Sequence, residues 1–563
     1  MSTPGDTSDT FCATLVDEWI RHGVQHAVIA PGSRSTPLAV QLARRLEISV
    51  HLFHDERSAS FAAVGIGEAT GVPAILLCTS GTAAAHFYGA VIEAHQAHVP
   101  MIVCTADRPP ELRDVGAPQT IDQTQMFGTA VRWFHDPGVP SDDAAHTWRS
   151  LASRCFAVTR GARPGPVHLN LPFREPLLGS VGEMPQDRPS GWSTVEMARS
   201  VSPHMVNDLV TLLSGRRGIV VAGKGATPEV LRFAQRAGWP VFADPRSGVR
   251  VCEPNVVIAF DSILRSTQFA DSHVPDVVLR VGEPPASKVT AQWLSRHNVP
   301  VVQVTPHEFI IDADHRMNHT FIAPIAEMFA GLTEQTVGVD DSWSAEWNAA
   351  ETVAQSAISE WTQNNWSEPA HARALTDALT PGTHFVVSSS MPIRDVEWFG
   401  TVTPDVVVHS NRGTNGIDGV ISTAVGVAAS MGAPTVVFVG DVACLHDSNG
   451  LLGVMQRGVD VKVVVTNNDG GSIFSFLPQA TQVDETTFEL LYGTPHNVSF
   501  EALAAAHGIP YHRATNASSL VDALHMAGTR FIEVPFSRGE NVGKHDAVNF
   551  AVVNALQNAG LTA

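Results

Sequence analysis

The chain has 563 residues, of which 44% are hydrophobic and 16% are charged, and its formal net charge is −20. At about 150 residues per domain, this length predicts three or four domains with large cores. The acidic balance argues against non-specific binding to nucleic acid. No stretch reaches about 18 uninterrupted apolar residues, so we expect no membrane span.

The cysteines are scattered along the chain without a CxxC pair. Because Cys78 and Cys104 lie in apolar runs, we expect reduced core residues rather than disulfides or a zinc site. The polar and acidic N-terminal residues lack the basic and apolar regions of a signal peptide. Together these features predict a cytoplasmic protein.

Residues 1–183 alternate predicted helices and strands, which indicates a first α/β domain. A helix is predicted over 11–22, followed by a short strand, a turn over 31–35 and a second helix that begins near Thr36 and Pro37. Ser33 and Arg34 precede this second helix. Because the N–H groups of a first turn attract anions, the pair favours an anion site over a plain helix cap.

Polar residues also follow the later strands of this domain. Glu56 comes directly after a strand and before a helix rich in small residues, where it could serve a site or form a surface ion pair with Arg57. A buried strand ends before Arg108, and a loop then reaches Gln119. A strand over 165–172 closes the domain.

A polar linker that contains proline is expected over residues 184–200, before a middle α/β domain over 200–342. In this domain Gly223-Lys224-Gly225 is similar to a dinucleotide-binding turn, but Pro228 stands in place of the third glycine. We therefore favour a supporting role between the outer domains over dinucleotide binding.

The third α/β domain is expected over residues 343–563 and begins with a helical connector over 343–365. Its first strand leads into a turn at Ser389 and Ser390 and then a helix that carries Arg394. The next strand leads into a Gly-rich loop that carries Arg412 and Ile417. A late strand is expected near residues 531–538.

Two buried strands of this domain end in polar clusters. The apolar runs over 435–439 and 461–465 are typical of parallel strands. The first run ends at Gly440-Asp441 and the second at residues 466–471, so both clusters lie where ligands bind in open α/β sheets. A helix is predicted between them over 449–457, with inward side chains at Leu451, Leu452 and Met455.

The polar atoms at these two strand ends suit a divalent cation. Asp441 supplies a carboxylate oxygen, Asn468 an amide oxygen, and the turn at Gly470 a backbone carbonyl. Mg²⁺ prefers oxygen ligands and often shares them with substrate phosphates. Gly470 and Gly471 would let backbone N–H groups approach a diphosphate. The alternative is that these are ordinary turns, in which Asp, Asn and Gly are also common.

One segment of the first domain recurs in the third. Ala63-Val64-Gly65, Gly71 and Pro73 reappear at a constant offset as Ala424-Val425-Gly426, Gly432 and Pro434. In both copies a helix of small residues leads through Gly-x-Pro into a buried strand. The repeat predicts a duplicated domain.

The pattern around Asp441 resembles that of the thiamine-diphosphate enzymes, in which Gly-Asp-Gly precedes Asn-Asn by somewhat under thirty residues. Val442 stands here in place of the final glycine. The stretches GDVACLHDSNGLL (440–452) and NNDGGSIFSFLP (467–478) are similar to the branch of that family that acts in menaquinone biosynthesis. The resemblance implies three doubly wound α/β domains with mostly parallel sheets, the first and third of them duplicated.

The resemblance also implies a cofactor, thiamine diphosphate, held by Mg²⁺ or Mn²⁺ at Asp441, Asn468 and Gly470. Glu56 matches the family's glutamate that binds N1′ of the cofactor's pyrimidine and promotes loss of the C2 proton. Further positions match the apolar prop, the wall and the diphosphate contacts of the cofactor site. These positions are Ser389, Ser390, Ile417, Gly440, Gly471, Ile473 and Phe474.

The substrates that the resemblance implies are 2-oxoglutarate and isochorismate, which each carry two carboxylates. Arginine binds carboxylates through paired hydrogen bonds, although some of these arginines could instead form salt bridges between domains. The implied substrate-facing or catalytic residues are Ser33, Arg34, Arg108, Gln119, Lys288, Arg394, Arg412, Phe474 and Leu477. Val289 stands where some members carry a further arginine.

The implied reaction is a decarboxylation of 2-oxoglutarate followed by carbon–carbon bond formation with isochorismate, which makes the chain a transferase. Another enzyme with the same cofactor, such as an acetolactate synthase or a 2-oxoacid decarboxylase, is the nearest alternative. A non-catalytic nucleotide-binding module is a third interpretation, against which the presence of Glu56, Asp441 and Asn468 argues. Because Glu56 and Asp441 lie in different domains, family architecture suggests sites shared across a homodimer, or a dimer of dimers that forms a homotetramer.

Overall fold

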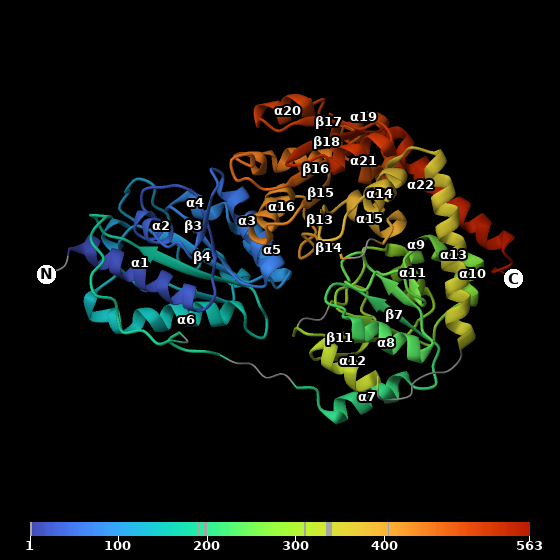
Figure 1. Cartoon of the computed structure of the whole chain (residues 1–563), viewed down its shortest axis with the longest axis horizontal. Coiled ribbons are helices and arrows are strands. Elements are labelled where there is room, and N and C mark those ends of the chain that lie inside the picture. Colours follow the sequence, from blue (N-terminus) through green and yellow to red (C-terminus); the bar gives the residue numbers. More distant parts are fainter. Residues whose placement is uncertain are drawn as a thin grey trace.

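The computed structural model describes residues 3–189, 191–195, 200–308, 311–333, 341–402 and 405–562. It contains three α/β bodies, which follow one another along the chain from blue through green to red in Figure 1. Each body is built on a sheet of six parallel strands. Within the described ranges, no helix is both long enough and apolar enough to cross a membrane.

The first sheet has the strand order β2-β1-β3-β4-β6-β5. Its strands are β1 (His26–Ile29), β2 (Ser49–Leu52), β3 (Ala74–Cys78), β4 (Met101–Asp107), β5 (Trp133–His135) and β6 (Pro166–Pro172). The helices of this body are α1 (Pro4–Arg21), α2 (Thr36–Ala43), α3 (Glu56–Thr70), α4 (Thr82–Ala85), α5 (Tyr88–Gln96) and α6 (Trp148–Thr159), with short 3-10 turns η1 (Pro110–Leu112), η2 (Gly128–Ala130) and η3 (Asp142–Thr147).

The middle sheet has the order β12-β11-β10-β7-β8-β9, which is the doubly wound order of dinucleotide-binding folds. Its strands are β7 (Gly218–Ala222), β8 (Val241–Ala243), β9 (Val256–Val257), β10 (Val277–Val281), β11 (Val301–Thr305) and β12 (Met317–Ile322). Its helices are α7 (Pro203–Leu213), α8 (Pro228–Ala237), α9 (Phe260–Leu264), α10 (Thr267–Ser272), α11 (Lys288–Arg296) and α12 (Ile325–Thr333).

The third sheet has the order β14-β13-β15-β16-β18-β17. Its strands are β13 (His384–Val387), β14 (Val407–His409), β15 (Thr435–Gly440), β16 (Val461–Asn467), β17 (Tyr511–Arg513) and β18 (Arg530–Pro535). Its longer helices are α13 (Asp341–Asn364), α14 (Glu368–Asp377), α15 (Met391–Phe399), α16 (Val420–Met431), α20 (Phe500–Ala506), α21 (Ala517–His525) and α22 (Arg538–Asn558). Its shorter elements are α17 (Asp441–His446), α18 (Gln479–Gln482), α19 (Glu485–Phe488), η4 (Ser448–Leu451), η5 (Ser472–Phe476) and η6 (Glu489–Gly493).

The first and third sheets have the same strand order when each is numbered from its own first strand, so the predicted duplication is confirmed. The repeated helices α3 and α16 pack against each other across the two bodies. A Cβ on Gly65 would lie 2.1 Å from the carbonyl oxygen of Thr423, and a Cβ on Gly426 would lie 2.1 Å from that of Ala62. The offset that relates Gly65 to Gly426 also relates Ala62 to Thr423, so the crossing is a pseudo-two-fold contact of backbone on backbone.

The helix predicted over 449–457 is wrong. The crossover from β15 to β16 contains the short helix α17, the 3-10 turn η4 and then turns. Gly453, in the middle of the predicted span, has a positive φ angle of 76°, which the interior of an α-helix does not allow. Leu451 is buried as predicted, but Leu452 and Met455 are 42% and 40% exposed.

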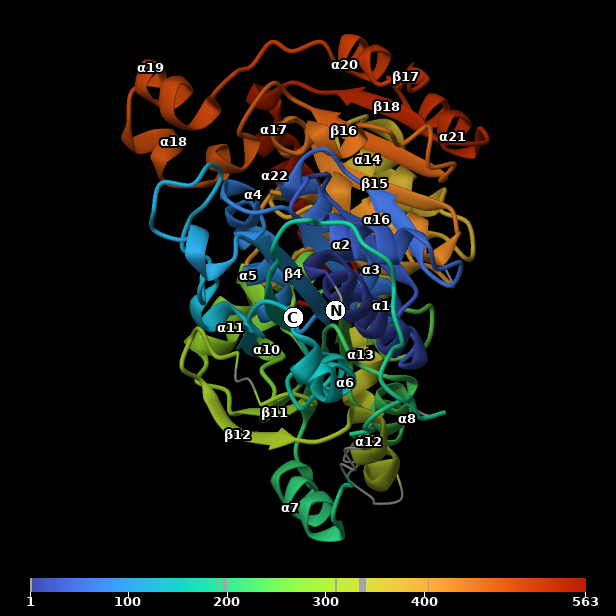
Figure 2. The ribbon, with the colours of Figure 1, turned by 90° about the vertical axis from the view of Figure 1, so that its left-hand side faces the viewer.

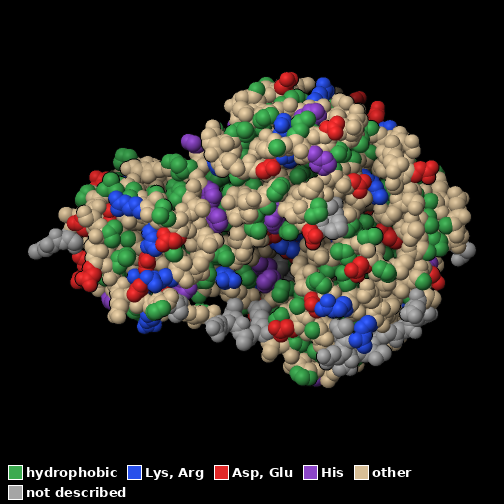
Figure 3. Space-filling model, in the orientation of Figure 1, with side chains coloured by type: hydrophobic (Ala, Val, Ile, Leu, Met, Phe, Trp, Pro, Cys, Tyr) green, Lys and Arg blue, Asp and Glu red, His purple; other side chains and the backbone are tan. Residues whose placement is uncertain are grey.

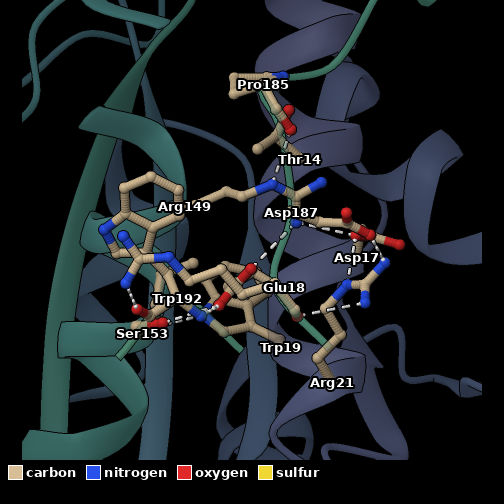
Figure 4. A network of polar contacts seen from close by, with 12 residues as sticks. Thr14, Asp17, Glu18, Trp19, Arg21, Arg149, Ser153, Pro185, Asp187 and Trp192 are labelled. Atoms are coloured by element: carbon tan, nitrogen blue, oxygen red, sulfur yellow. Dashed lines mark hydrogen bonds and ion pairs between the residues drawn. The ribbon is translucent and has the colours of Figure 1, made fainter. Parts of the chain in front are cut away.

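The polypeptide between the first two bodies is attached to the first body by a polar network (Figure 4). Arg149 of α6 contacts Asp17 and Glu18 of α1, both at 2.9 Å, and donates to the carbonyl of Pro185 at 2.8 Å. Arg21 pairs with Asp187, and the N–H group of Trp192 donates to Glu18. The predicted linker over 184–200 therefore begins as a segment bound to the first body; residue 190 and residues 196–199 lie outside the described residues.

The cysteines follow the prediction with one exception. Cys12, Cys78, Cys104, Cys155 and Cys444 are buried and free, and Cys252 is exposed. Burial raises the pKa of the Cys104 thiol. The buried thiols are therefore unreactive core side chains.

Candidate cofactor and active site

A cavity of about 200 Å³ opens where β15 and β16 end, at the carboxyl edge of the third sheet. The described residues that line it all belong to the third body. Ten of them were predicted as cofactor-site residues, and these are Ser389, Ser390, Ile417, Gly440, Asp441, Asn468, Gly470, Gly471, Ile473 and Phe474. The two polar strand ends that the sequence places at neighbouring strands thus meet in one site.

Asp441 is held rigidly at the first residue of α17. Its Oδ2 accepts hydrogen bonds from the backbone N–H groups of Asn468 and Gly470, both at 3.0 Å, and its Oδ1 accepts from the N–H group of Val442 at 2.6 Å. The residue is 2% exposed. Because carboxylate oxygens have several lone-pair directions, this arrangement fixes the group and leaves capacity for a cation.

Asn468 supplies the second oxygen of the cavity. Its side-chain nitrogen donates to Glu368 at 2.8 Å. Its side-chain oxygen is buried and has no hydrogen-bond partner among the described residues. A buried polar atom without a partner is costly unless something absent from the protein chain satisfies it. The oxygen donors of Asp441 and Asn468 therefore fit a divalent cation.

The glycines of this turn have a packing role that the sequence did not reveal. A Cβ on Gly470 would lie 1.9 Å from the carbonyl oxygen of Gly493, and a Cβ on Gly471 would lie 2.2 Å from that of Tyr492. The N–H group of Gly471 donates to Gly493 at 2.8 Å, and that of Gly470 donates to Asp441. Both N–H groups are thus engaged within the protein, and the glycines let η6 approach the turn.

The N-terminus of α15 faces the same cavity. Ser390 precedes this helix with a φ angle of 74°, a strained backbone conformation for a residue with a side chain. The Ser389 hydroxyl donates to the carbonyl of Asn411 at 3.1 Å, which joins the turn to the Gly-rich loop. The positive end of the helix dipole of α15 therefore adds to the edge that carries Asp441 and Asn468, although Pro392 has no N–H group and that of Ile393 donates to Ser388 at 3.1 Å.

Several residues of this site were not identified from the sequence. Glu368 and Asp395 line the cavity, and His496 places its Nε2 3.4 Å from Asp441. Burial, followed by the charge of Asp395, raises the pKa of Glu368 to about 7. Glu368 starts helix α14 directly after the capping residue Ser367, so in the sequence it has the pattern of an ordinary helix start.

Glu56 does not line this cavity. It is the first residue of α3 and is half-buried near Cys78. Its neighbour Arg57 donates to the carbonyl of His446 at 2.6 Å, and Asp55 accepts from Asn449 at 2.7 Å. Glu56 therefore lies beside the far end of α17, and Asp441 lies at the other end of that helix.

Three predicted substrate residues gather around Ser80 in the first body. Arg108 donates to the Ser80 hydroxyl at 2.8 Å, and the Gln119 side chain donates to the Ser80 carbonyl at 3.1 Å. Arg34 lies close enough for its charge, after burial, to lower the pKa of Arg108. Arg34 itself is buried and donates to Phe173 and Glu175, each at 3.0 Å, so it is also a structural ion pair; Ser33 is exposed beside it.

The other two predicted arginines lie in different places. Arg394 of α15 donates to the carbonyl of Ser390, which lines the Asp441 cavity. Arg412 lines a second cavity of about 610 Å³ between the bodies, together with Lys224 and Arg246. Figure 3 shows a hollow between the bodies where basic and histidine side chains gather. Burial, followed by the charge of Arg246, lowers the pKa of Arg412 to about 10, and burial lowers the pKa of Arg394.

Lys288 and Leu477 lie outside both sets of cavity residues. Lys288 is an exposed side chain at the start of α11, and Leu477 is half-buried after η5. At the turn Gly223-Lys224-Gly225, Lys224 lies 2.7 Å from Glu68 of α3 in the first body. This ion pair supports the expected bridging role of the middle body.

Family comparisons agree with this architecture. Residues 9–126 match the family described as the N-terminal TPP binding domain of thiamine pyrophosphate enzymes, residues 183–387 match its middle domain, and residues 401–534 match its C-terminal TPP binding domain. The fold is similar to that of benzoylformate decarboxylase from Polynucleobacter necessarius, with a TM-score of 0.70 over 94% of this chain and 99% of the other, at 16% identity. The chain belongs to the thiamine pyrophosphate enzymes.

Three curated relatives narrow the class of thiamine pyrophosphate enzyme. The 2-succinyl-5-enolpyruvyl-6-hydroxy-3-cyclohexene-1-carboxylate synthases of Chloroflexus aurantiacus and Thermobifida fusca are each 40% identical to this chain and match 98% of it, over 97% and 100% of their own lengths. The synthase of Lysinibacillus sphaericus is 37% identical over 94% of the chain and 95% of its own length. Within the thiamine pyrophosphate enzymes, the chain belongs to this synthase family.

Proposed function

We propose that this chain is a transferase of menaquinone biosynthesis that uses thiamine diphosphate to decarboxylate 2-oxoglutarate and joins the remaining four-carbon unit to isochorismate. The observation that carries the proposal is the match, at 40% identity and nearly full length, to synthases named for that product. The cavity at Asp441 and Asn468 supports it, because its oxygen donors and helix end suit a metal-bound diphosphate.

Asp441, Asn468 and the carbonyl of Gly470 would hold Mg²⁺, or Mn²⁺ in its place, against the diphosphate. When bound, thiamine diphosphate supplies a carbon nucleophile and an electron sink for decarboxylation. Glu56 would hold the pyrimidine through a hydrogen bond at N1′ and control its protonation. Ile417, Ile473 and Phe474 would exclude water from the reacting carbon, which strengthens the polar contacts inside the site.

The arginines would bind the carboxylates. Arg34 and Arg108 form one cationic pair, with the neutral amide of Gln119 beside Arg108 at Ser80. Arg394 and Arg412 form another, in which burial lowers the pKa of both guanidinium groups and the charge of Arg394 also lowers that of Arg412. A buried cation has lost its hydration, so it is stabilised strongly when an anion binds beside it.

In the proposed reaction the bond to the 1-carboxylate of 2-oxoglutarate breaks with loss of carbon dioxide, and a new carbon–carbon bond forms to the ring of isochorismate. Purified protein with Mg²⁺ and thiamine diphosphate should release carbon dioxide from 2-oxoglutarate and form the joined product only when isochorismate is present. Pyruvate replaces 2-oxoglutarate as the control, because it lacks the second carboxylate that the arginines would bind. Equal turnover of pyruvate would indicate an acetolactate synthase or simple decarboxylase instead. No turnover of either substrate, together with no thermal stabilisation by cofactor and metal, would overturn the proposal.

Assembly and location remain predictions. All described lining residues of the Asp441 cavity come from the third body, and Glu56 is elsewhere in the chain. We therefore propose that Glu56 of one copy completes the cavity of another in a homodimer or dimer of dimers, and that the enzyme is cytoplasmic.

A further inference from the structure

A group of buried polar side chains adjoins the Asp441 cavity and comes from four elements of the third body. Its members come from the start of α14, from α15, from the segment that follows β16, and from α22. They are Glu368, Asp395, Asn468, Ser472, Asn541 and His545. All six are buried, and Glu368, Asp395, Asn468 and Ser472 also line the cavity.

The hydrogen bond between Asn468 and Glu368 determines the orientation of the Asn468 amide. The side-chain nitrogen of Asn468 donates to a carboxyl oxygen of Glu368 at 2.8 Å. A carboxyl oxygen facing the nitrogen is satisfied, whereas the same oxygen facing the amide oxygen would leave two acceptors in contact. Glu368 therefore turns the amide oxygen of Asn468 away from itself, toward the cavity, where that oxygen has no partner among the described residues.

Glu368 is itself enclosed. It is 3% exposed at the first residue of α14, and the Asn541 side chain lies close enough to lower its pKa. Asn541 also donates to the Ser472 hydroxyl at 2.6 Å, and its carbonyl lies 2.9 Å from Nδ1 of His545. His545 in turn pairs with Asp395 at 2.8 Å. The Glu368 carboxyl group is therefore packed beside a set of side chains that are themselves fixed by hydrogen bonds to α22.

Packing alone does not explain an acid at this position. A buried carboxyl group loses hydration, and an apolar side chain of similar volume would fill the space at a lower cost in folding free energy. The hydrogen bond to Asn468 provides a reason for the acid, because an asparagine without a directing partner can present either its oxygen or its nitrogen.

We propose that Glu368 is a positioning residue that fixes the amide of Asn468 with its oxygen toward the bound divalent cation. The inference deepens the proposed function, because it rests on Asn468 as a metal ligand there. Partners of this kind in the outer shell of metal sites commonly contribute about 10–100-fold to metal affinity. Glu368 does not touch substrate or cofactor in this role.

The test exchanges the acid and the amide between the two positions. Mg²⁺ binding is measured by titration calorimetry in the presence of thiamine diphosphate, and the Tm of each metal-free protein is recorded. In Asn468→Asp, the new side chain has no amide N–H group to donate to Glu368 and crowds a second carboxyl group against it, and we expect Mg²⁺ affinity to fall by about 10–100-fold. In the double variant Asn468→Asp/Glu368→Gln, the new amide donates to the new carboxylate and leaves the other carboxylate oxygen for the metal, so affinity should recover by at least about tenfold.

Two single variants give the second measurement. Glu368→Leu should lose about 10–100-fold in Mg²⁺ affinity, whereas Glu368→Gln keeps an acceptor oxygen and should stay within about threefold of the parent. A purely structural residue would instead lower the metal-free Tm in proportion to the affinity loss. Unchanged affinity in Glu368→Leu, or a double variant no better than Asn468→Asp, would overturn the inference.

The parent protein separates this inference from the proposed function. If it binds Mg²⁺ with the cofactor but the exchange has no effect, only the role of Glu368 is overturned. If the parent shows no cofactor-dependent Mg²⁺ binding, the metal site of the proposed function is overturned, and the role of Glu368 with it.

Discussion

The acidic side chains Asp441 and Glu56 differ in how the backbone holds them, and this difference determines the expected effect of substituting each one. Asp441 is fixed by three backbone N–H groups and is 2% exposed, so its carboxylate is held in one orientation in which it could bind a cation. Glu56 is half-buried at a helix start and has no comparable set of backbone donors in the described structure. The first side chain is suited to bind an ion, as proposed for Asp441, and the second can contact a group that comes from outside its own body.

Asp441→Ala should abolish metal-dependent cofactor binding. Loss of the only carboxylate among the proposed metal ligands should weaken affinity by about a hundredfold or more, beyond the range typical of outer-shell partners. Calorimetric titration of thiamine diphosphate with and without Mg²⁺ measures the effect. Asp522→Ala, an exposed position on α21 with the same change of charge, is the matched control. Undiminished affinity in Asp441→Ala would assign the metal to another place.

Glu56→Gln should retain cofactor binding and lose turnover by about a hundredfold or more, which is the range for a group that controls protonation. The amide keeps the shape of the side chain but cannot shift the protonation of the pyrimidine in the same way. Steady-state assays combined with cofactor titration separate the two effects. Turnover close to that of the parent would refute the role of Glu56.

At the scale of elements, much of the third body could be predicted because its strands are short apolar runs with sharp polar ends. Asp441 and Asn468 could be placed together on that basis, since parallel strands align their carboxyl ends. The helix over 449–457 could not be judged from spacing, because the positive φ angle of Gly453 and the exposure of Leu452 and Met455 belong to the folded turn. Glu368 was missed for a similar reason: its contact with Asn468 joins elements 100 residues apart.

The crossing of α3 and α16 gives a prediction for these helices. Gly65→Ala or Gly426→Ala would push a methyl group to within 2.1 Å of a backbone oxygen, and overpacking against the backbone should lower the Tm by about 5 °C or more. Gly543→Ala in α22 is the control, because a Cβ there meets nothing within 4 Å and alanine favours the helix. Scanning calorimetry should show no loss for the control; equal Tm values for all variants would contradict the crossing.

A second element-scale prediction concerns Glu397 of α15, which is buried against the middle body and accepts from the N–H group of Ala286 at 2.7 Å. Burial, followed by the charges of Asp244 and Asp261, raises its pKa from 4.5 to about 8. A carboxyl group whose pKa is higher in the folded than in the unfolded state is protonated in both states below pH 4.5. As the pH rises from 4.5 toward 8, the unfolded state loses this proton first, so the free energy of unfolding decreases.

Glu397→Gln should therefore gain stability relative to the parent as the pH increases from about 5 to about 8, because the amide keeps the neutral form at every pH. Chemical denaturation of both proteins at several pH values measures the difference. A difference that stays constant across this range, or one that grows in favour of the parent, would contradict the raised pKa.

For the whole molecule, the buried core is continuous between the first and third bodies, and the middle body has its own core shared with α13 and α22. Figure 2 shows α18 and α19 projecting from the third body beside the first. The sequence predicted three α/β units and their duplication, but it could not place Lys224 against Glu68 or leave Glu56 outside the Asp441 cavity. Those relations depend on how the bodies dock, which no local pattern contains.

If two copies share each site, mixing the inactive variants Glu56→Gln and Asp441→Ala should restore activity. Random exchange makes half of the dimers mixed, and one of the two sites in each mixed dimer has both groups intact, so about a quarter of the parent activity is expected. Assays before and after subunit exchange test this. Each variant exchanged with itself is the control, and no recovery in a verified mixed dimer would place the whole site within one chain.

The glycine crossing has a mechanical consequence. At Gly65 and Gly426, the backbone of one helix packs directly against the backbone of the other, near Thr423 and Ala62, with no side chain of the glycine between them. A shift of one outer body against the other therefore cannot be absorbed by side-chain rearrangement at this crossing. We expect movements that admit reactants to occur away from it, for example in the projecting helices α18 and α19.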